Sequence, residues 1–160
     1  MILGMSADLF TLVHVILSLV GIGSGFIVVF GLLTANRLPR LTALFFASTA
    51  ATSLSGFLFP FKGFTPGIAV GILSIFVLLM SIFARYGRAL AGPWRGTYVI
   101  STALALYFNV LVFITQLFEK VSPLKALAPT QTEAPFKLTQ LVVMAFFILI
   151  TTLAFKRFRS

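Results

Sequence analysis

Long apolar runs alternate with short polar connections along the whole chain. Five such runs cover residues 9–33, 41–59, 67–84, 98–118 and 138–155. A helix of about 17 to 25 apolar residues crosses a hydrocarbon core about 30 Å thick, and each run has roughly that length. The pattern therefore predicts an all-α, polytopic membrane helix bundle with five transmembrane helices, which forms a single transmembrane domain over residues 1–160.

Small and hydrogen-bonding side chains recur at helical spacing within these runs, most clearly in residues 98–118. In that run Thr102, Ala105, Asn109 and Gln116 fall on one face. Helices in lipid associate through such side chains rather than through hydrophobicity, so we expect this face to point into the bundle.

The segment after this run, residues 119–137, contains Pro123, Pro129 and Pro135 together with several apolar side chains. Proline restricts the backbone, and a purely solvated tether has no need of apolar residues. We therefore expect residues 119–137 to form an ordered outer loop that folds back over the bundle.

Composition agrees with a membrane protein and removes several classes of function. Of the 160 residues, 59% are hydrophobic and 9% are charged, which is far from the proportions of a soluble globular domain. Cysteine is absent, so disulfides, thiol catalysis and metal sites built on cysteine are excluded. The net charge of +9 comes from short basic groups between apolar runs, a pattern that indicates membrane topology rather than nucleic-acid binding.

Basic residues are distributed unequally between two alternating sets of connections. Eight follow the first, third and fifth apolar runs, whereas four lie in the second and fourth connections. Basic residues near helix ends stay on the cytoplasmic side, here of a bacterial inner (plasma) membrane. An outside amino terminus and an inside carboxyl terminus satisfy every connection. The eight residues expected inside are Arg37, Arg40, Arg85, Arg88, Arg95, Lys156, Arg157 and Arg159.

His14 is the only histidine, and it lies inside the first apolar run. An ionisable side chain at membrane depth is a candidate for function, here as a proton acceptor or as a metal or haem ligand. The alternative is a neutral imidazole that hydrogen-bonds to Ser18, Gln116 or Gln140. A b-type haem usually takes two axial ligands, and this chain has a single histidine. We therefore expect no bound metal and no cofactor, and a haem is the minor alternative.

Polar groups on and beyond residues 98–118 are the other candidates. Asn109 and Gln116 either tie helices together or hold a polar head group, such as a quinone carbonyl or a lipid ester. Glu119 and Glu133 are able to hold a divalent cation or act in acid–base chemistry, although their spacing requires neither. The candidate ligand-binding residues are His14, Ser18, Asn109, Gln116, Gln131, Glu133 and Gln140.

Three stretches of the chain carry a resemblance in overall style to known proteins: His14–Gly25, Ser53–Gly67 and Ala105–Phe136. In these stretches the chain resembles an uncharacterised family of small bacterial integral membrane proteins. The resemblance implies a bacterial membrane location and brings no activity, cofactor or ligand residue with it.

Missing motifs narrow the function further. The sequence has no carboxylate inside a predicted span, no HExxH motif and no Ser/His/Asp set, so it favours a protein that is not an enzyme. We expect it to bind or convey a small lipophilic or amphipathic molecule at an outward-facing cleft between residues 9–33, 98–118 and 138–155. The alternatives are a structural or assembly subunit of a larger membrane complex, and a membrane redox protein that uses His14.

The expected partners follow from the same features. We expect the lipid bilayer to surround the protein, and a lipid, a quinone or another membrane protein to be a bound partner. The pairs Gly21/Gly25 and Gly67/Gly71 have the small-xxx-small spacing that lets helices approach closely, so a homo-oligomer also remains open.

Overall fold

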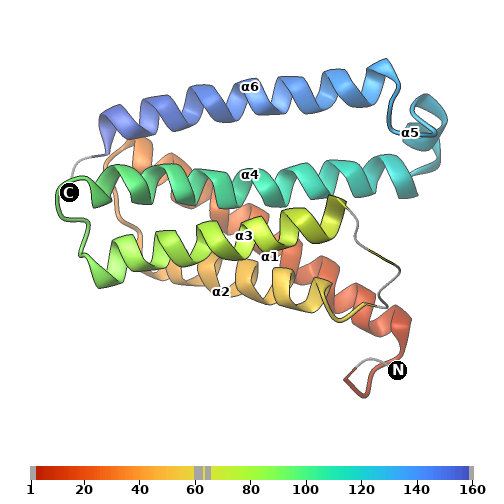
Figure 1. Ribbon diagram of the computed structural model, residues 1–160, viewed down its shortest axis with the longest axis horizontal. Helices are drawn as coiled ribbons and strands as arrows, with labels where there is room; N and C mark the ends of the chain where they lie inside the picture. The colour runs from red at the N-terminus through yellow and green to blue at the C-terminus, as the bar shows by residue number, and fades with distance from the viewer. Residues whose placement is uncertain (1–2, 60–62, 64–65, 159–160) are drawn as a thin grey trace.

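The computed structural model describes residues 3–59, 63 and 66–158, and within them every regular element is helical. Figure 1 shows an up-and-down bundle in which successive long helices run in opposite directions and the two chain termini lie at opposite ends. The predicted all-helical class is confirmed. The elements are α1 (Ala7–Leu33), α2 (Pro39–Gly56), α3 (Pro66–Ile82), the π-helical turn η1 (Phe83–Gly87), α4 (Trp94–Lys120), α5 (Ser122–Leu127) and α6 (Ala134–Arg157).

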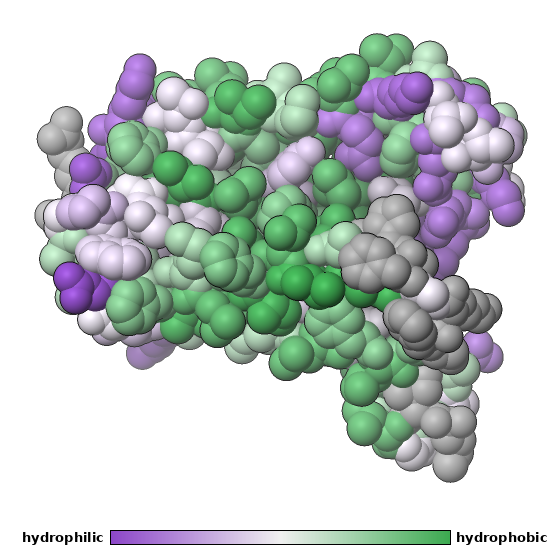
Figure 2. Space-filling view, in the orientation of Figure 1, coloured by the Kyte–Doolittle hydropathy of each residue, from purple (hydrophilic) through white to green (hydrophobic). Residues whose placement is uncertain are grey.

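Four helices within the described residues are long and apolar enough to cross a membrane: α1, α3 together with η1, α4 and α6. The second predicted span corresponds to α2, which is not one of the four. Figure 2 shows apolar side chains across the middle of the visible face, with hydrophilic residues concentrated toward the two ends. Since water does not stabilise an exposed apolar belt of this kind, the bundle has the surface of a membrane protein.

Proline determines where several helices begin. Pro39, Pro123 and Pro135 each lie in the first turn of a helix, where the missing N–H removes no helical hydrogen bond. As a result, the segment expected to be an outer loop, residues 119–137, contains the end of α4, the whole of α5 and the start of α6. The irregular part of this connection is confined to Val121 and residues 128–133.

Helix α4 lies at the centre of the bundle, where it packs against α1, α3, α5 and α6. Thr102 and Ala105 on its predicted inward face are fully buried, and so is Tyr98 one turn before Thr102. The Thr102 and Ser81 hydroxyl oxygens are 2.5 Å apart, and the Arg85 guanidinium donates to the Tyr98 hydroxyl at 2.9 Å. Polar contacts in the protein interior therefore hold α3 and η1 against α4.

Helices α1 and α2 form an antiparallel hairpin with close backbone approach. Gly25 makes this approach possible, because a Cβ atom there would lie 2.7 Å from both the Phe45 ring and the Leu106 side chain. Both neighbours are fully buried, so they have little room to move away. A glycine in the second half of α1 thus sets the spacing between α1, α2 and α4.

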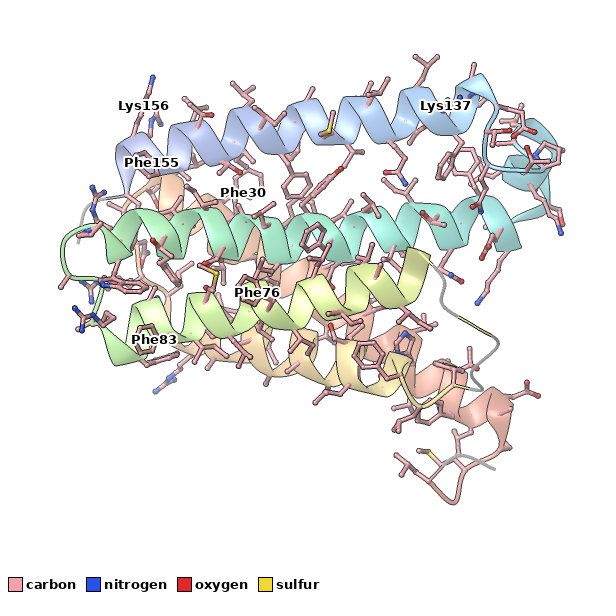
Figure 3. All side chains as sticks on the ribbon, in the orientation of Figure 1. Phe30, Phe76, Phe83, Lys137, Phe155 and Lys156 are labelled. Atoms are coloured by element: carbon pink, nitrogen blue, oxygen red, sulfur yellow. The ribbon has the colours of Figure 1, made fainter. Side chains whose placement is uncertain are left out.

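Helix α6 covers one side of α4 and is the most exposed of the long helices. Only Phe147, Ile150 and Ala154 of its described side chains are buried. Figure 3 shows Lys137 and Lys156 at its two ends, with Phe155 directed toward α4, where its ring packs against Gly96. Between these two lysines, most of its exposed side chains are apolar and require lipid or another protein as a neighbour.

Replacement of Gly25 by alanine is expected to destabilise the protein by about 1–3 kcal/mol, because the added methyl group overpacks the contact with Phe45 and Leu106. Gly23→Ala is the matched control, since a Cβ atom there meets nothing within 4 Å. Reversible unfolding in mixed micelles would measure both variants. Equal stability of the two variants would contradict the packing argument.

Candidate functional site

A cavity of about 530 Å³ lies between α1, α2, α3 and α4. Its walls come from the first half of α1, the end of α2, the start of α3 and the second half of α4, which places it toward the end of the bundle that carries the amino terminus and α5 (Figure 1). Its volume is in the range of small-molecule sites in proteins. The polar residues in its lining are Thr11, His14, Ser18, Thr52, Ser53, Ser74, Asn109, Gln116 and Lys120.

Small residues and aromatic rings shape the apolar part of the cavity. Gly56 and Gly71 both line it; a Cβ atom at Gly71 would lie 3.0 Å from the Phe57 ring. Phe108 and Phe113 of α4 contribute rings from the opposite wall. The cavity therefore combines an apolar body with several hydrogen-bonding groups, which is the chemistry of a site for an amphipathic molecule.

His14 is oriented by a residue that the sequence reasoning did not find. Its Nδ1 lies 2.6 Å from the Ser55 hydroxyl oxygen, and its ring packs edge-on against Phe59 at a centroid distance of 5.3 Å. The three partners considered from the sequence do not take this role, and Ser18 instead donates its hydroxyl to the Val15 carbonyl at 2.7 Å. His14 Nε2 has no hydrogen-bond partner among the residues that the structure describes.

The two α4 amides differ in how far the protein satisfies them. Asn109 donates its Nδ2 to the Thr49 hydroxyl at 3.1 Å, so it ties α4 to α2 while it also lines the cavity. Gln116 lines the cavity seven residues further along α4, and its amide has no hydrogen bond to any described residue. Because an amide has strong donors and acceptors, Gln116 is available to a ligand or to water.

Lys120 is the second functional candidate that the sequence reasoning missed. It lies one turn beyond Gln116 on the same helix, lines the cavity and is close enough to His14 to act on it electrostatically. No carboxylate is present among the described residues of the lining. The site is therefore able to carry positive charge and favours ligands with anionic or hydrogen-bond-accepting groups.

The structure places the other three sequence candidates outside the lining of this cavity. Gln131 donates to the Thr115 carbonyl at 3.3 Å, and Gln140 donates to the Leu111 carbonyl at 3.2 Å. These bonds connect the 128–133 segment and α6 to the backbone of α4. The cavity thus has α2 and α3 as walls where the sequence reasoning expected residues 138–155.

Glu133 organises the short segment before α6. Its carboxylate accepts hydrogen bonds from the Thr130 hydroxyl at 2.7 Å, the Thr130 amide at 3.2 Å and the Thr132 amide at 3.1 Å. The Thr130 hydroxyl is the largest influence, and with the backbone amides it lowers the pKa of Glu133 below its ordinary value. No group of three or more metal-ligating side chains occurs within the part of the chain that the structure covers.

Removal of the Thr130 hydroxyl is expected to raise the pKa of Glu133. A carboxyl group whose pKa is lowered by folding stabilises the folded segment above its unfolded-state pKa, and this contribution disappears as the pH falls through the lowered value. Carboxyl ¹³C shifts across an acid titration would therefore show a higher midpoint in Thr130→Val. Thr139→Val is the control, because its hydroxyl donates to the Pro135 carbonyl and not to Glu133; an equal shift in both variants would contradict the assignment.

Comparison with known proteins adds no identity to this geometry: no protein-family model, no curated protein and no solved structure matches the chain.

Proposed function

We propose that the chain crosses a bacterial plasma membrane five times, with the amino terminus outside and the carboxyl terminus inside. Helices α1 and α3 run in the same direction (Figure 1), so the chain has to return between them, and α2 makes this return. The 18 residues of α2 extend over about 27 Å at about 1.5 Å per residue, which is close to the hydrocarbon thickness of about 30 Å.

Hydrogen bonds within α2 support its place in the membrane despite its polar composition. The Ser48 and Thr52 hydroxyls each donate to a carbonyl of their own helix at 2.7 Å. Thr49 is fully buried, and its hydroxyl accepts the bond from Asn109. Lipid would therefore meet few unsatisfied polar groups on this helix.

The distribution of charge supports the orientation. The connections α1–α2 and α3–α4 and the end of α6 lie together at one end of the bundle (Figure 1) and carry most of the basic residues. At the same end, the Arg88 guanidinium lies 5.5 Å from the centroid of the Trp94 ring, and aromatic residues favour the membrane interface. By the positive-inside rule, this end faces the cytoplasm.

Single cysteines test this topology without background, because the chain contains none. With an impermeant maleimide applied to intact bacterial cells, Leu58→Cys and Thr132→Cys are expected to react. Thr34→Cys and Ala91→Cys are expected to react only after the cells are permeabilised. Reaction of Thr34→Cys and Leu58→Cys from the same side would show that α2 does not cross the membrane.

Within this membrane, we propose that the protein binds or conveys a small amphipathic molecule in the cavity between α1 and α4. One observation carries this proposal: a largely apolar cavity of about 530 Å³ is lined by Lys120 and by two polar groups, the Gln116 amide and His14 Nε2, that have no hydrogen-bond partner among the described residues. A helix-packing role alone does not account for polar groups without protein partners, since such groups are costly at membrane depth. A bound head group would satisfy them.

A bulky side chain in the cavity is expected to abolish this binding. Ser18→Phe places a ring in the lining, whereas Leu19→Phe enlarges an exposed neighbour on the lipid-facing side and is the control. A long-chain alcohol with a photoreactive diazirine would be crosslinked to the protein in nanodiscs. Peptides that include residues 108–121 should be labelled in the control and lose most of their label in Ser18→Phe.

The outcome that opposes the binding proposal is labelling restricted to α6 in all proteins. That result would favour the alternative, a subunit of a larger complex. A groove of about 630 Å³ between α4 and α6 supports this alternative, because it is apolar apart from Tyr107, Thr151, Thr152 and Lys156 and is able to receive a helix of another protein. Constant co-purification with a second chain would favour it further.

A further inference from the structure

The Ser55 hydroxyl makes two contacts that determine the protonation of His14. Its oxygen lies 2.6 Å from His14 Nδ1 and 3.0 Å from the Thr52 carbonyl oxygen, one turn earlier in α2. A hydroxyl has one hydrogen, and a carbonyl oxygen has none to give. Both contacts are hydrogen bonds at the same time only if Ser55 donates to Thr52 and the imidazole donates its Nδ1 hydrogen to Ser55.

In the neutral ring, this arrangement leaves the lone pair on Nε2. His14 lines the cavity, and Nε2 has no partner among the described residues. Room beside the ring comes from Gly56, where a Cβ atom would lie 3.6 Å from the His14 Cε1 atom. The cavity therefore presents one strong hydrogen-bond acceptor that awaits a donor.

The other polar groups of the cavity differ from His14 Nε2 because they include hydrogen-bond donors, which pair with acceptor atoms of a ligand. Lys120 is a donor only, and Gln116 offers both a donor and an acceptor. Of the described lining residues, His14 and Lys120 are the only ones that carry or acquire a charge. A ligand head group that suits them all has an acidic O–H for His14 and an oxygen that becomes negative for Lys120.

A carboxylic acid on an apolar tail has both features in one group. In the bilayer the low dielectric constant favours its neutral O–H form. An alcohol offers a hydrogen but acquires no negative charge, an ester offers no hydrogen, and an amine is repelled by Lys120. The aromatic and small residues of the walls suit an alkyl chain.

Building on the proposed function, we propose that the cavity binds a long-chain carboxylic acid and that His14 Nε2 accepts its proton. The O–H bond of the acid breaks and an Nε2–H bond forms, while the electron pair of the broken bond remains on the carboxylate. The imidazolium keeps its Nδ1 hydrogen bond to Ser55. The carboxylate then lies beside two cations, His14 and Lys120, in a site where such charges interact strongly.

Ring-¹⁵N-labelled histidine tests the proton position directly, because the chain has a single histidine. In nanodiscs at about pH 8, above the ordinary histidine pKa of about 6.5, Nδ1 is expected to give a pyrrole-like signal and Nε2 a pyridine-like signal. Saturation with palmitic acid should convert the Nε2 signal to the protonated type. The opposite tautomer, or an Nε2 signal unchanged by bound palmitic acid, overturns the inference.

Affinities in the same nanodiscs separate this inference from the proposed function. Palmitic acid should bind at least about tenfold more tightly than methyl palmitate or hexadecanol, and His14→Gln and Lys120→Gln should each remove most of that preference. Lys125→Gln, on α5 and outside the lining, should retain it. Equal affinities for the three probes would overturn the carboxylic-acid proposal and leave amphiphile binding intact, whereas no binding by any probe would defeat both.

Discussion

Every polar group that enters a hydrocarbon layer has to be satisfied from within the protein, and this constraint governs the whole bundle. Helical hydrogen bonds satisfy the backbone, and hydroxyl groups such as Ser24 and Ser48 donate to carbonyls of the preceding turn. Most side chains that reach another helix find a partner there, as Arg85 does at Tyr98, although the buried Oε1 of Gln140 has none among the described residues. The same constraint makes Gln116 and His14 Nε2 stand out, since they are polar groups without protein partners in the described residues.

Two antiparallel hairpins, α1–α2 and α3–α4, provide the frame for this arrangement. In the first, the pairs His14–Ser55 and Gly25–Phe45 share nearly the same midpoint in the sequence, close to residue 35 at the start of the connection. In the second, Ser81–Thr102 and Arg85–Tyr98 follow the same rule around their own connection. The two hairpins pack together along α4. Toward the end of the bundle that carries the amino terminus they move apart, and the space between them is the cavity of about 530 Å³.

Much of the fold was readable from the chain, because apolar length and helical spacing of small residues depend on local sequence. The inward face with Thr102 and Ala105 is an example, and both residues are fully buried. Position along the bundle axis was also readable, but position around the bundle was not. Gln140 and His14 lie toward the same end of the bundle, yet Gln140 bonds to the side of α4 away from the cavity. The residues of an apolar run do not by themselves determine which other helix packs beside it.

The missed partner of His14 had a usable signal. In a tight helical hairpin, residues equally distant from the connection face one another, so the position of His14 points to the region of Ser55. Lys120 carried a weaker signal: it lies four residues after Gln116 and therefore shares its helix face. The helix ends were harder to place, because Pro123 and Pro135 are as compatible with the first turn of a helix as with a loop.

The polar composition of α2 has a consequence for how the protein is made. A helix with so many hydroxyl groups has a weak tendency to leave the translocation channel for lipid alone. Part of its surface is covered by α1 and α3, and its Thr49 hydroxyl is bonded by Asn109 of α4. Since α1 is synthesised before α2 and is strongly apolar, it can remain next to the translocation channel and pair with α2 as α2 emerges. On the five-span topology, α1 and α2 therefore enter the membrane together. Pairing with α1 then compensates for the low hydrophobicity of α2.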